Sequence, residues 1–234
     1  MTTLTGVADG VTRDEPRISK SEQTRELILT TALRLFREQG YDKATMRAIA
    51  AEAGVSVGNA YYYFSSKEHL IQAFYDQMQV QHRAVAAPAL ATETTFTRRL
   101  AAVFDAWLVV SAPYHEFAGG FFRNAAAPKS PLSPFSAESG PAREASISLF
   151  RDVVEGSDLK VSPELRRELP ELLWLAHMGL VMFWVHDDSR GLRRTRRLVG
   201  RSVPMADRLL RLTRIPGVRG VVNDLVELVR DVRV

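Results

Sequence analysis

The stretch between Thr45 and Lys67, TMRAIAAEAGVSVGNAYYYFSSK, predicts two short helices joined by a tight turn. Thr45 can cap the first helix, because a hydroxyl just before a helical pattern accepts a hydrogen bond from an otherwise unpaired backbone N–H. Gly54 suits the end of that helix, where a left-handed residue is needed and a Cβ would be strained. Ser56 can cap the second helix, which we expect over residues 57–64. The first helix has an apolar face at three- and four-residue spacing, made of Met46, Ile49, Ala50 and Ala53.

The second helix of this helix-turn-helix pattern has a composition suited to a DNA surface. In units of this kind the second helix lies in the major groove. Val57 and Gly58 would lie in its first turn, where small residues let the backbone approach DNA closely. Asn59 can bond twice to an adenine edge, and the hydroxyls of Tyr61 and Tyr62 can reach phosphate oxygens. The pattern alone leaves a second interpretation open, because an ordinary helical pair of an all-α protein also needs a glycine turn and an apolar face.

Basic charge is not concentrated at this end of the chain. The net charge is +4 and the pI is about 9.6, but residues 1–66 contain as many Asp and Glu as Lys and Arg. DNA affinity would therefore depend on the local placement of Arg25, Arg47 and Lys67. Lys67 lies at the start of the next expected helix, where the helix dipole also favours a phosphate, and either Ser65 or Ser66 can cap that helix.

A dense set of residues carries a family resemblance: Ile28, Leu29, Ala32, Leu35, Phe36, Gly40, Tyr41, Thr45, Ile49, Ala50, Ala53, Gly54, Val55, Ser56, Gly58, Tyr61, Tyr62, Phe64, Lys67, Glu68 and Leu70. On these residues, the segment 21–75 resembles the DNA-binding domain of the TetR family of bacterial transcriptional regulators. The resemblance implies that Thr45 and Lys67 contact phosphate and that residues 56–62 form the recognition helix. Val57 and Asn59 differ from the residues frequent at their positions, so the resemblance does not imply the operator sequence.

We predict an all-α fold with two domains. The resemblance implies an N-terminal three-helix helix-turn-helix DNA-binding domain, followed by a C-terminal helical domain for ligand binding and dimerisation. We expect a disordered arm over residues 1–20, the DNA-binding domain over 21–66, a connecting helix over 67–87 that ends before Pro88, and the second domain over 88–234.

The remaining sequence is a succession of helical patterns without a strand pattern. We expect helices over residues 22–39, 65–86, 98–110, 115–127, 138–155, 164–186, 190–214 and 218–232. Pro204 should kink or divide the penultimate helix. The helix over 164–186 is apolar nearly all round, which predicts burial on both sides. The resemblance implies that residues 164–188 and 190–214 pair with their counterparts in a second subunit, so that a two-fold homodimer reads a near-palindrome in double-stranded DNA.

The second domain is rich in aromatic residues, and core packing explains much of this content. The resemblance adds an apolar cavity for a small-molecule effector whose identity it does not supply. The candidate ligand-binding residues are Trp107, Phe121, Phe122, Phe150, Trp174, His177, Val181 and Trp184. His177 can be either a polar group of this pocket or a buried core histidine with its own partners.

Other functional classes lack their sequence signatures. The chain has no Cys, no phosphate-binding loop, no serine-hydrolase motif and no histidine spacing typical of a metal site, so we expect no enzyme and no cofactor. No apolar run approaches a membrane span, and no signal sequence is evident, so we expect a cytoplasmic protein. The Arg-rich segment 190–201 is either a solvated face or a site for an anionic group. A helical carrier or sensor with a vestigial DNA domain is the alternative function.

Overall fold

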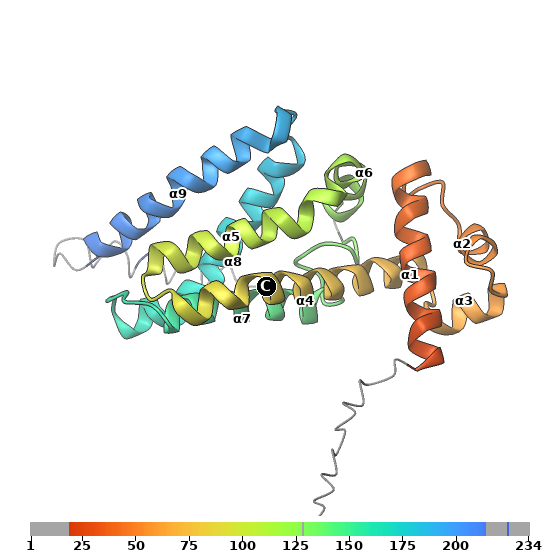
Figure 1. Ribbon diagram of the computed structural model, residues 1–234, viewed down its shortest axis with the longest axis horizontal. Helices are drawn as coiled ribbons and strands as arrows, with labels where there is room; N and C mark the ends of the chain where they lie inside the picture. Colours follow the sequence, from red (N-terminus) through yellow and green to blue (C-terminus); the bar gives the residue numbers. More distant parts are fainter. Residues whose placement is uncertain (1–18, 128, 214–223, 225–234) are drawn as a thin grey trace, which may run out of the picture.

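The computed structural model describes residues 19–127, 129–213 and 224, and within them the fold is entirely helical (Figure 1). The α-helices are α1 (Lys20–Gln39), α2 (Met46–Glu52), α3 (Val57–Tyr63), α4 (Lys67–Thr92), α5 (Phe96–Ser111), α6 (His115–Ala125), α7 (Gly140–Glu155), α8 (Pro163–Val185) and α9 (Arg193–Leu212), and two short 3-10 helices are η1 (Ala112–Tyr114) and η2 (Arg190–Leu192). The all-α prediction is confirmed for this part of the chain. Residues 1–18 of the expected arm over 1–20, and the expected helix over 218–232 apart from residue 224, lie outside the described residues. The arm's last two residues were assigned wrongly, because Ser19 caps α1 and Lys20 begins it.

Helices α1–α3 form a small unit at one end of the molecule, and the first half of α4 completes its core (Figure 1). The local signals that define this unit are confirmed. Thr45 and Ser56 cap α2 and α3, and Gly54 has a φ of 67°, in the left-handed region where a Cβ is strained. Phe36 and Ile49 are fully buried between these helices. Most of this core comes from residues 28–74, and Ala125 and Leu132 join it from further along the chain.

Helix α4 begins where it was expected but ends later. Ser66 caps it by accepting a hydrogen bond from the His69 N–H, whereas Ser65 bonds to the His69 ring instead. The helix then continues through Pro88 to Thr92, so the expected end before Pro88 is wrong. Proline inside a helix costs about 3 kcal/mol. Burial of Ala86 in the core of the second unit, with Leu90 packed against that core, holds the helix together across this position.

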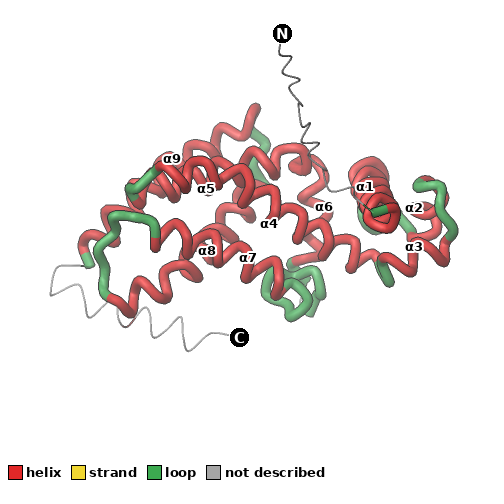
Figure 2. The backbone as a smooth tube through the Cα atoms, turned by 60° about the horizontal axis from the view of Figure 1, so that its bottom comes forward, coloured by secondary structure: helices red, strands yellow, loops and turns green. Residues whose placement is uncertain are grey.

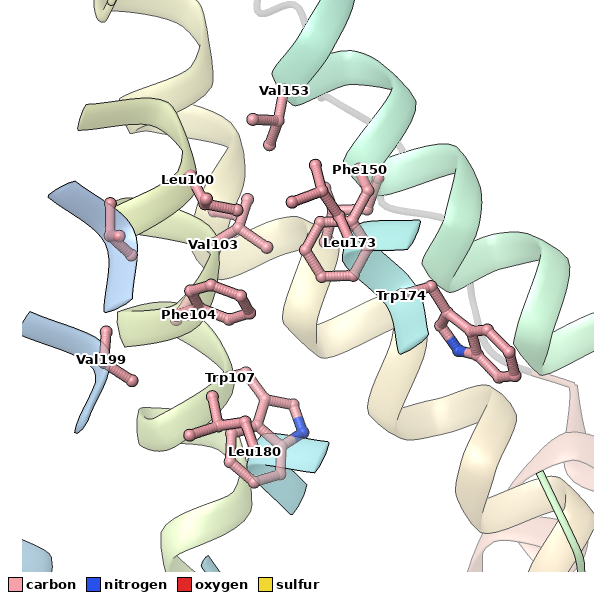
Figure 3. Packing of buried hydrophobic residues seen from close by; sticks show 14 of the residues in the cluster. Leu100, Val103, Phe104, Trp107, Phe150, Val153, Leu173, Trp174, Leu180 and Val199 are labelled. Atoms are coloured by element: carbon pink, nitrogen blue, oxygen red, sulfur yellow. The ribbon is translucent and has the colours of Figure 1, made fainter. Parts of the chain in front are cut away.

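The second unit is a bundle of α4, α5, α7, α8 and α9 around one hydrophobic core (Figures 2 and 3). Phe104 and Phe150 meet at the centre of this core, with ring centroids 5.9 Å apart. Helix α9 is continuous through Pro204, so the expected division there is wrong. Val199 and Val203 are buried on the preceding turns of α9, and their packing in the core keeps the helix in one piece.

Helix α8 is long and apolar enough to cross a membrane by length and composition alone, contrary to the sequence prediction. Here it packs in the bundle, with Leu173, Leu180 and Trp184 buried in the core. Its outer face, however, is also apolar and exposed, as is one face of α9. The exposed residues are Leu175, Met182 and Phe183 on α8 and Leu198, Met205, Leu209 and Leu212 on α9. We call this set the apolar outer face.

Candidate DNA-binding and ligand-binding sites

Helix α3 presents one face to the outside and buries the other. The Ser56 hydroxyl accepts a hydrogen bond from the Asn59 N–H at 3.0 Å, which fixes the first turn. Val57, Tyr61 and Tyr62 have exposed fractions of 38%, 49% and 81%, although all three are large and at least partly apolar. Gly58 between them is exposed and has no atom within 4 Å of the position a Cβ would take. The outer face of α3 is therefore an open surface that offers two phenol hydroxyls and a bare stretch of backbone.

The inner face of α3 is anchored by three contacts. Ala60 is fully buried, and Phe64 is nearly so. The Tyr63 hydroxyl is hydrogen-bonded to the Ser21 hydroxyl of α1 at 3.1 Å. The guanidinium of Arg25 lies 5.0 Å from the centre of the Phe64 ring, as a cation–π contact. These contacts fix the orientation of the helix relative to α1.

Lys67 is held by the turn between α1 and α2. Its ammonium donates hydrogen bonds to the Tyr41 and Asp42 carbonyl oxygens at 2.8 and 3.4 Å, and it lies 4.4 Å from the centre of the Tyr41 ring. An ammonium has three N–H groups, so one remains for a phosphate. Arg47 and Thr45 are exposed on the neighbouring surface of α2. The candidate DNA contacts thus lie on α2, α3 and the start of α4, with Arg25 on α1.

A cavity of about 510 Å³ opens between α4 and α8 inside the second unit. Its wall includes seven of the eight candidate ligand residues: Trp107, Phe121, Phe122, Trp174, His177, Val181 and Trp184. Phe150 is not part of the wall. It is fully buried in the core, where its ring centroid lies 5.7 Å from that of His177. Helical periodicity identified Phe150 as buried, but it does not distinguish a cavity wall from the core behind it.

Sequence analysis missed the contribution of α4 to this cavity. Phe74, Tyr75 and Met78 line it from α4, and Ser111 and Ser146 do so from α5 and α7. The three α4 residues were not among the candidate ligand residues, because that helix was predicted only to connect the two domains. No sequence signal marks the two serines, because each is a small residue within an apolar helix.

His177 is electrically neutral in its site. Burial, together with the neighbouring His82, lowers its pKa to about 3. Its ring stacks at 6.0 Å against both His82 and Phe104, and the Trp107 ring meets it edge-on at 5.0 Å. The Nε2–H of His82 donates a hydrogen bond to the Val103 carbonyl oxygen at 2.8 Å, and burial lowers the pKa of His82 as well. The cavity wall therefore carries no histidine charge at neutral pH.

Aromatic contacts connect the cavity to the small unit of α1–α3 and the first half of α4, which we call the DNA-binding unit. Phe121 of α6 lines the cavity, and its ring centroid lies 6.3 Å from that of Tyr41 and 5.6 Å from that of Tyr75. The Tyr41 hydroxyl donates to the Glu68 carboxylate at 3.1 Å. The same Tyr41 lies beneath the Lys67 ammonium. A displacement of α6 would therefore act directly on the turn that holds Lys67.

The Arg-rich segment lies away from this cavity. Its arginines are exposed on η2 and α9, and none of them lines the cavity wall. Arg194 forms an ion pair with Asp188 at 2.8 Å. The adjacent Asp187 is buried and accepts hydrogen bonds from the backbone and side chain of both Ser189 and Thr195. Asp187 thus caps the start of α9. The described residues contain no cluster of three potential metal ligands.

Comparison with known families gives two matches. Residues 28–74 match the family described as "Bacterial regulatory proteins, tetR family", and residues 99–230, more than half of the chain, match "Tetracyclin repressor-like, C-terminal domain". The "HTH-type transcriptional regulator UidR" of Escherichia coli K12 is 41% identical over 68 residues, which are 29% of this chain and 34% of that protein. The "HTH-type transcriptional regulator SrpR" of Pseudomonas putida is 33% identical over 88 residues, 38% of this chain and 41% of that protein. These matches span less than half the length of either relative.

Solved structures share the fold over most of the chain. A TetR transcriptional regulator from Nitrosomonas europaea has a TM-score of 0.60 at 22% identity and covers 79% of this chain and 98% of its own. The Thermus thermophilus FadR repressor, solved in complex with lauroyl-CoA, has a TM-score of 0.55 at 22% identity, with 75% and 92% coverage. At these identities the likeness concerns the fold.

Proposed function

The chain belongs to the TetR family of bacterial regulatory proteins, and from this we propose that it is a homodimeric transcriptional repressor which a small apolar ligand releases from a near-palindromic operator. One observation carries the proposal. The capped helix α3 exposes Gly58, Tyr61 and Tyr62 on a single outer face, in a geometry suited to the major groove. We assign DNA binding to residues 21–66, the connection to residues 67–87 and effector binding and dimerisation to the remainder.

The apolar outer face supports a dimer. One α3 per subunit reads one half-site, so two half-sites require two subunits related by a two-fold axis. Met205 and Leu209 are each 56% exposed, and large apolar side chains gathered on one face favour a partner that covers them. We assign the face to the dimer interface, with α8 and α9 of both subunits forming a four-helix bundle.

The cavity supports control by a ligand. Helices α4 and α6 both contribute to its wall and both contact the DNA-binding unit, through Phe74 in the core of that unit and through Phe121 at Tyr41. A ligand that fits the cavity best when these helices are displaced would favour a state with different spacing of the two α3 helices. The free energy that couples ligand binding to DNA binding equals the difference in the ligand's binding free energy between the two states, typically about 1–3 kcal/mol. This role requires no enzyme chemistry and places the protein in the cytoplasm with its DNA.

The direct test is selection of bound sequences from random DNA, followed by footprinting on the promoter of the protein's own gene. We expect a protected near-palindrome. Tyr62→Phe removes one exposed hydroxyl and should weaken operator binding, whereas Tyr114→Phe removes a hydroxyl from η1, away from α3, and is the matched control. Failure of the protein to select any sequence would contradict the proposal and would favour a small-molecule carrier instead.

A further inference from the structure

The cavity wall contains buried polar atoms that have no hydrogen-bond partner among the described residues. The described residues as a whole contain six such side-chain atoms. Four of the six belong to residues of the cavity wall: Ser111 Oγ, Ser146 Oγ, His177 Nδ1 and Trp184 Nε1. We call these the four unpaired groups. They come from α5, α7 and α8, and each of the four residues is at most 4% exposed. A buried polar atom left unpaired costs about 1–3 kcal/mol, so this concentration at one cavity indicates a bound partner.

The four unpaired groups are all uncharged. Two are hydroxyls, one is an indole N–H and one is the nitrogen of an imidazole that burial keeps neutral. Together they can donate to and accept from hydroxyl, carbonyl or ether oxygens of a ligand. None of them can neutralise a carboxylate or a phosphate. The interior therefore recognises oxygen groups that carry no charge.

Charge is nearly absent from the rest of the wall. Arg143 is the one ionised side chain among the described residues that line the cavity, and its Nη1 already donates to the Pro134 and Ser136 carbonyl oxygens at 2.8 and 3.0 Å. Those two bonds use the N–H groups of Nη1 and leave those of Nε and Nη2. Burial of an anion away from a cationic partner costs several kcal/mol, and the wall has no carboxylate to balance a cation. An ionic headgroup is thus disfavoured over most of this cavity, and an anionic one would have to lie against Arg143.

The apolar part of the wall is mainly aromatic. Ten aromatic side chains line the cavity, and Trp107 and Trp184 meet there edge to face, with ring centroids 5.1 Å apart. Such walls favour flat rings, which can add further stacked or edge-to-face contacts worth about 0.5–1.5 kcal/mol each. A flexible alkyl chain gains only the area term and loses more conformational freedom on binding.

We propose that the effector is an uncharged aromatic or polycyclic molecule whose hydroxyl or carbonyl oxygens bind the four unpaired groups. This inference rests on the proposed function, because it names the ligand class for the same cavity. It differs from lauroyl-CoA, with which the Thermus thermophilus FadR repressor was solved. The alternative of an anionic ligand held by the arginines of residues 190–201 becomes one outcome of the test.

The three tryptophans of the chain all line the cavity, so their fluorescence reports its occupancy directly. Energy transfer from tryptophan to pyrene would be titrated with pyrene, 1-hydroxypyrene and 1-pyrenecarboxylate at pH 7, with lauroyl-CoA as a competitor. We expect 1-hydroxypyrene to bind about 3- to 10-fold more tightly than pyrene, as one net hydrogen bond provides. The carboxylate should bind more weakly than pyrene, and lauroyl-CoA should not displace the probe.

Serine variants assign the preference to the wall. Ser111→Ala and Ser146→Ala should each reduce the ratio of the 1-hydroxypyrene and pyrene affinities towards one. Ser148→Ala is the matched control, because its hydroxyl accepts a hydrogen bond from Arg83 outside the cavity. The ratio is measured on one protein sample with two probes, so a change in the folded fraction cancels.

Three outcomes would each overturn the proposed class of uncharged aromatic ligands. They are equal affinities for pyrene and 1-hydroxypyrene, tighter binding of the carboxylate or of lauroyl-CoA, and binding of no probe. The same preparation is assayed on the selected operator, which separates this failure from failure of the proposed function. Operator binding relieved by an anionic ligand would overturn the ligand class alone. Absence of operator binding would overturn the regulator proposal, while the ranking of the probes still decides the chemistry of the cavity.

Discussion

Gly156→Ala should destabilise the second unit by displacing a buried cation. Arg99 is 6% exposed and donates to four carbonyl oxygens: Leu90 and Glu93 at 2.7 Å each, Asp152 at 2.7 Å and Val153 at 3.3 Å. These carbonyls belong to the C-terminal ends of α4 and α7 and to the residue that follows α4, where the helix dipoles are negative. A Cβ on Gly156 would lie closer than 3.0 Å to three atoms of the guanidinium, so the two cannot coexist.

The size of the effect follows from these contacts. Displacement of the guanidinium breaks at least the bond from Nη2 to Asp152, and a hydrogen bond to a charged group contributes about 1.5–3 kcal/mol. The backbone of Gly156 has a φ of −80°, which alanine adopts without strain. Alanine also lowers the conformational entropy of the unfolded chain, which stabilises the folded protein by about 0.4–1 kcal/mol. We therefore expect a net loss of about 2 kcal/mol, and more if the other three bonds are also lost.

The assay is urea unfolding followed by circular dichroism at one fixed protomer concentration, because stability of a dimer depends on concentration. Gly200→Ala is the matched control. Gly200 lies inside α9 with no atom within 4 Å of its would-be Cβ, so this variant should gain about 0.5–1 kcal/mol. A free energy of unfolding for Gly156→Ala within about 0.5 kcal/mol of the wild type would refute the assigned role of Arg99.

Three further predictions follow from other contacts. Ser56→Ala removes the cap of α3 and should cost about 1 kcal/mol of stability by urea unfolding, with weaker operator binding; unchanged values of both would contradict it. Leu209→Glu in the apolar outer face should give monomers by sedimentation and lower operator affinity, and a persistent dimer would exclude this face as the interface. Burial raises the pKa of Asp187, but hydrogen bonds from Ser189 and Thr195 outweigh it and hold the pKa below its usual range. The stability lost in Asp187→Asn should therefore be largest at neutral pH and shrink as the pH falls below about 4, and a loss independent of pH down to the acid limit would refute this cause.

The DNA-binding unit was predictable because its signals are local. The caps at Thr45 and Ser56 and the left-handed Gly54 involve residues within four positions of one another, so sequence spacing nearly determines their geometry. Pro88 and Pro204 were misjudged for the opposite reason. Their helices continue because distant residues pack on both sides of the proline, and such packing cannot be read from one helix alone.

The candidate sites were predictable to different degrees. Burial of His177 and Trp184 followed from the apolar helix that carries them, and the structure places both at the cavity. The pairing of Lys67 with the Tyr41 and Asp42 carbonyls joins residues more than 20 positions apart, so no local pattern indicates it. The unpaired hydroxyls of Ser111 and Ser146 depend on the absence of partners in three dimensions, which a sequence does not record.

Helix α4 has 26 residues and extends from the DNA-binding unit through the bundle, so it acts as a lever. At 1.5 Å per residue its length is about 39 Å. A tilt of about 5° about its C-terminal end moves its N-terminal end by about 3.4 Å, which equals the rise of one base pair. In a two-fold dimer the two displacements add. A small change in the cavity wall is therefore enough to alter the separation of the two recognition helices, so that it no longer matches the spacing of successive major grooves.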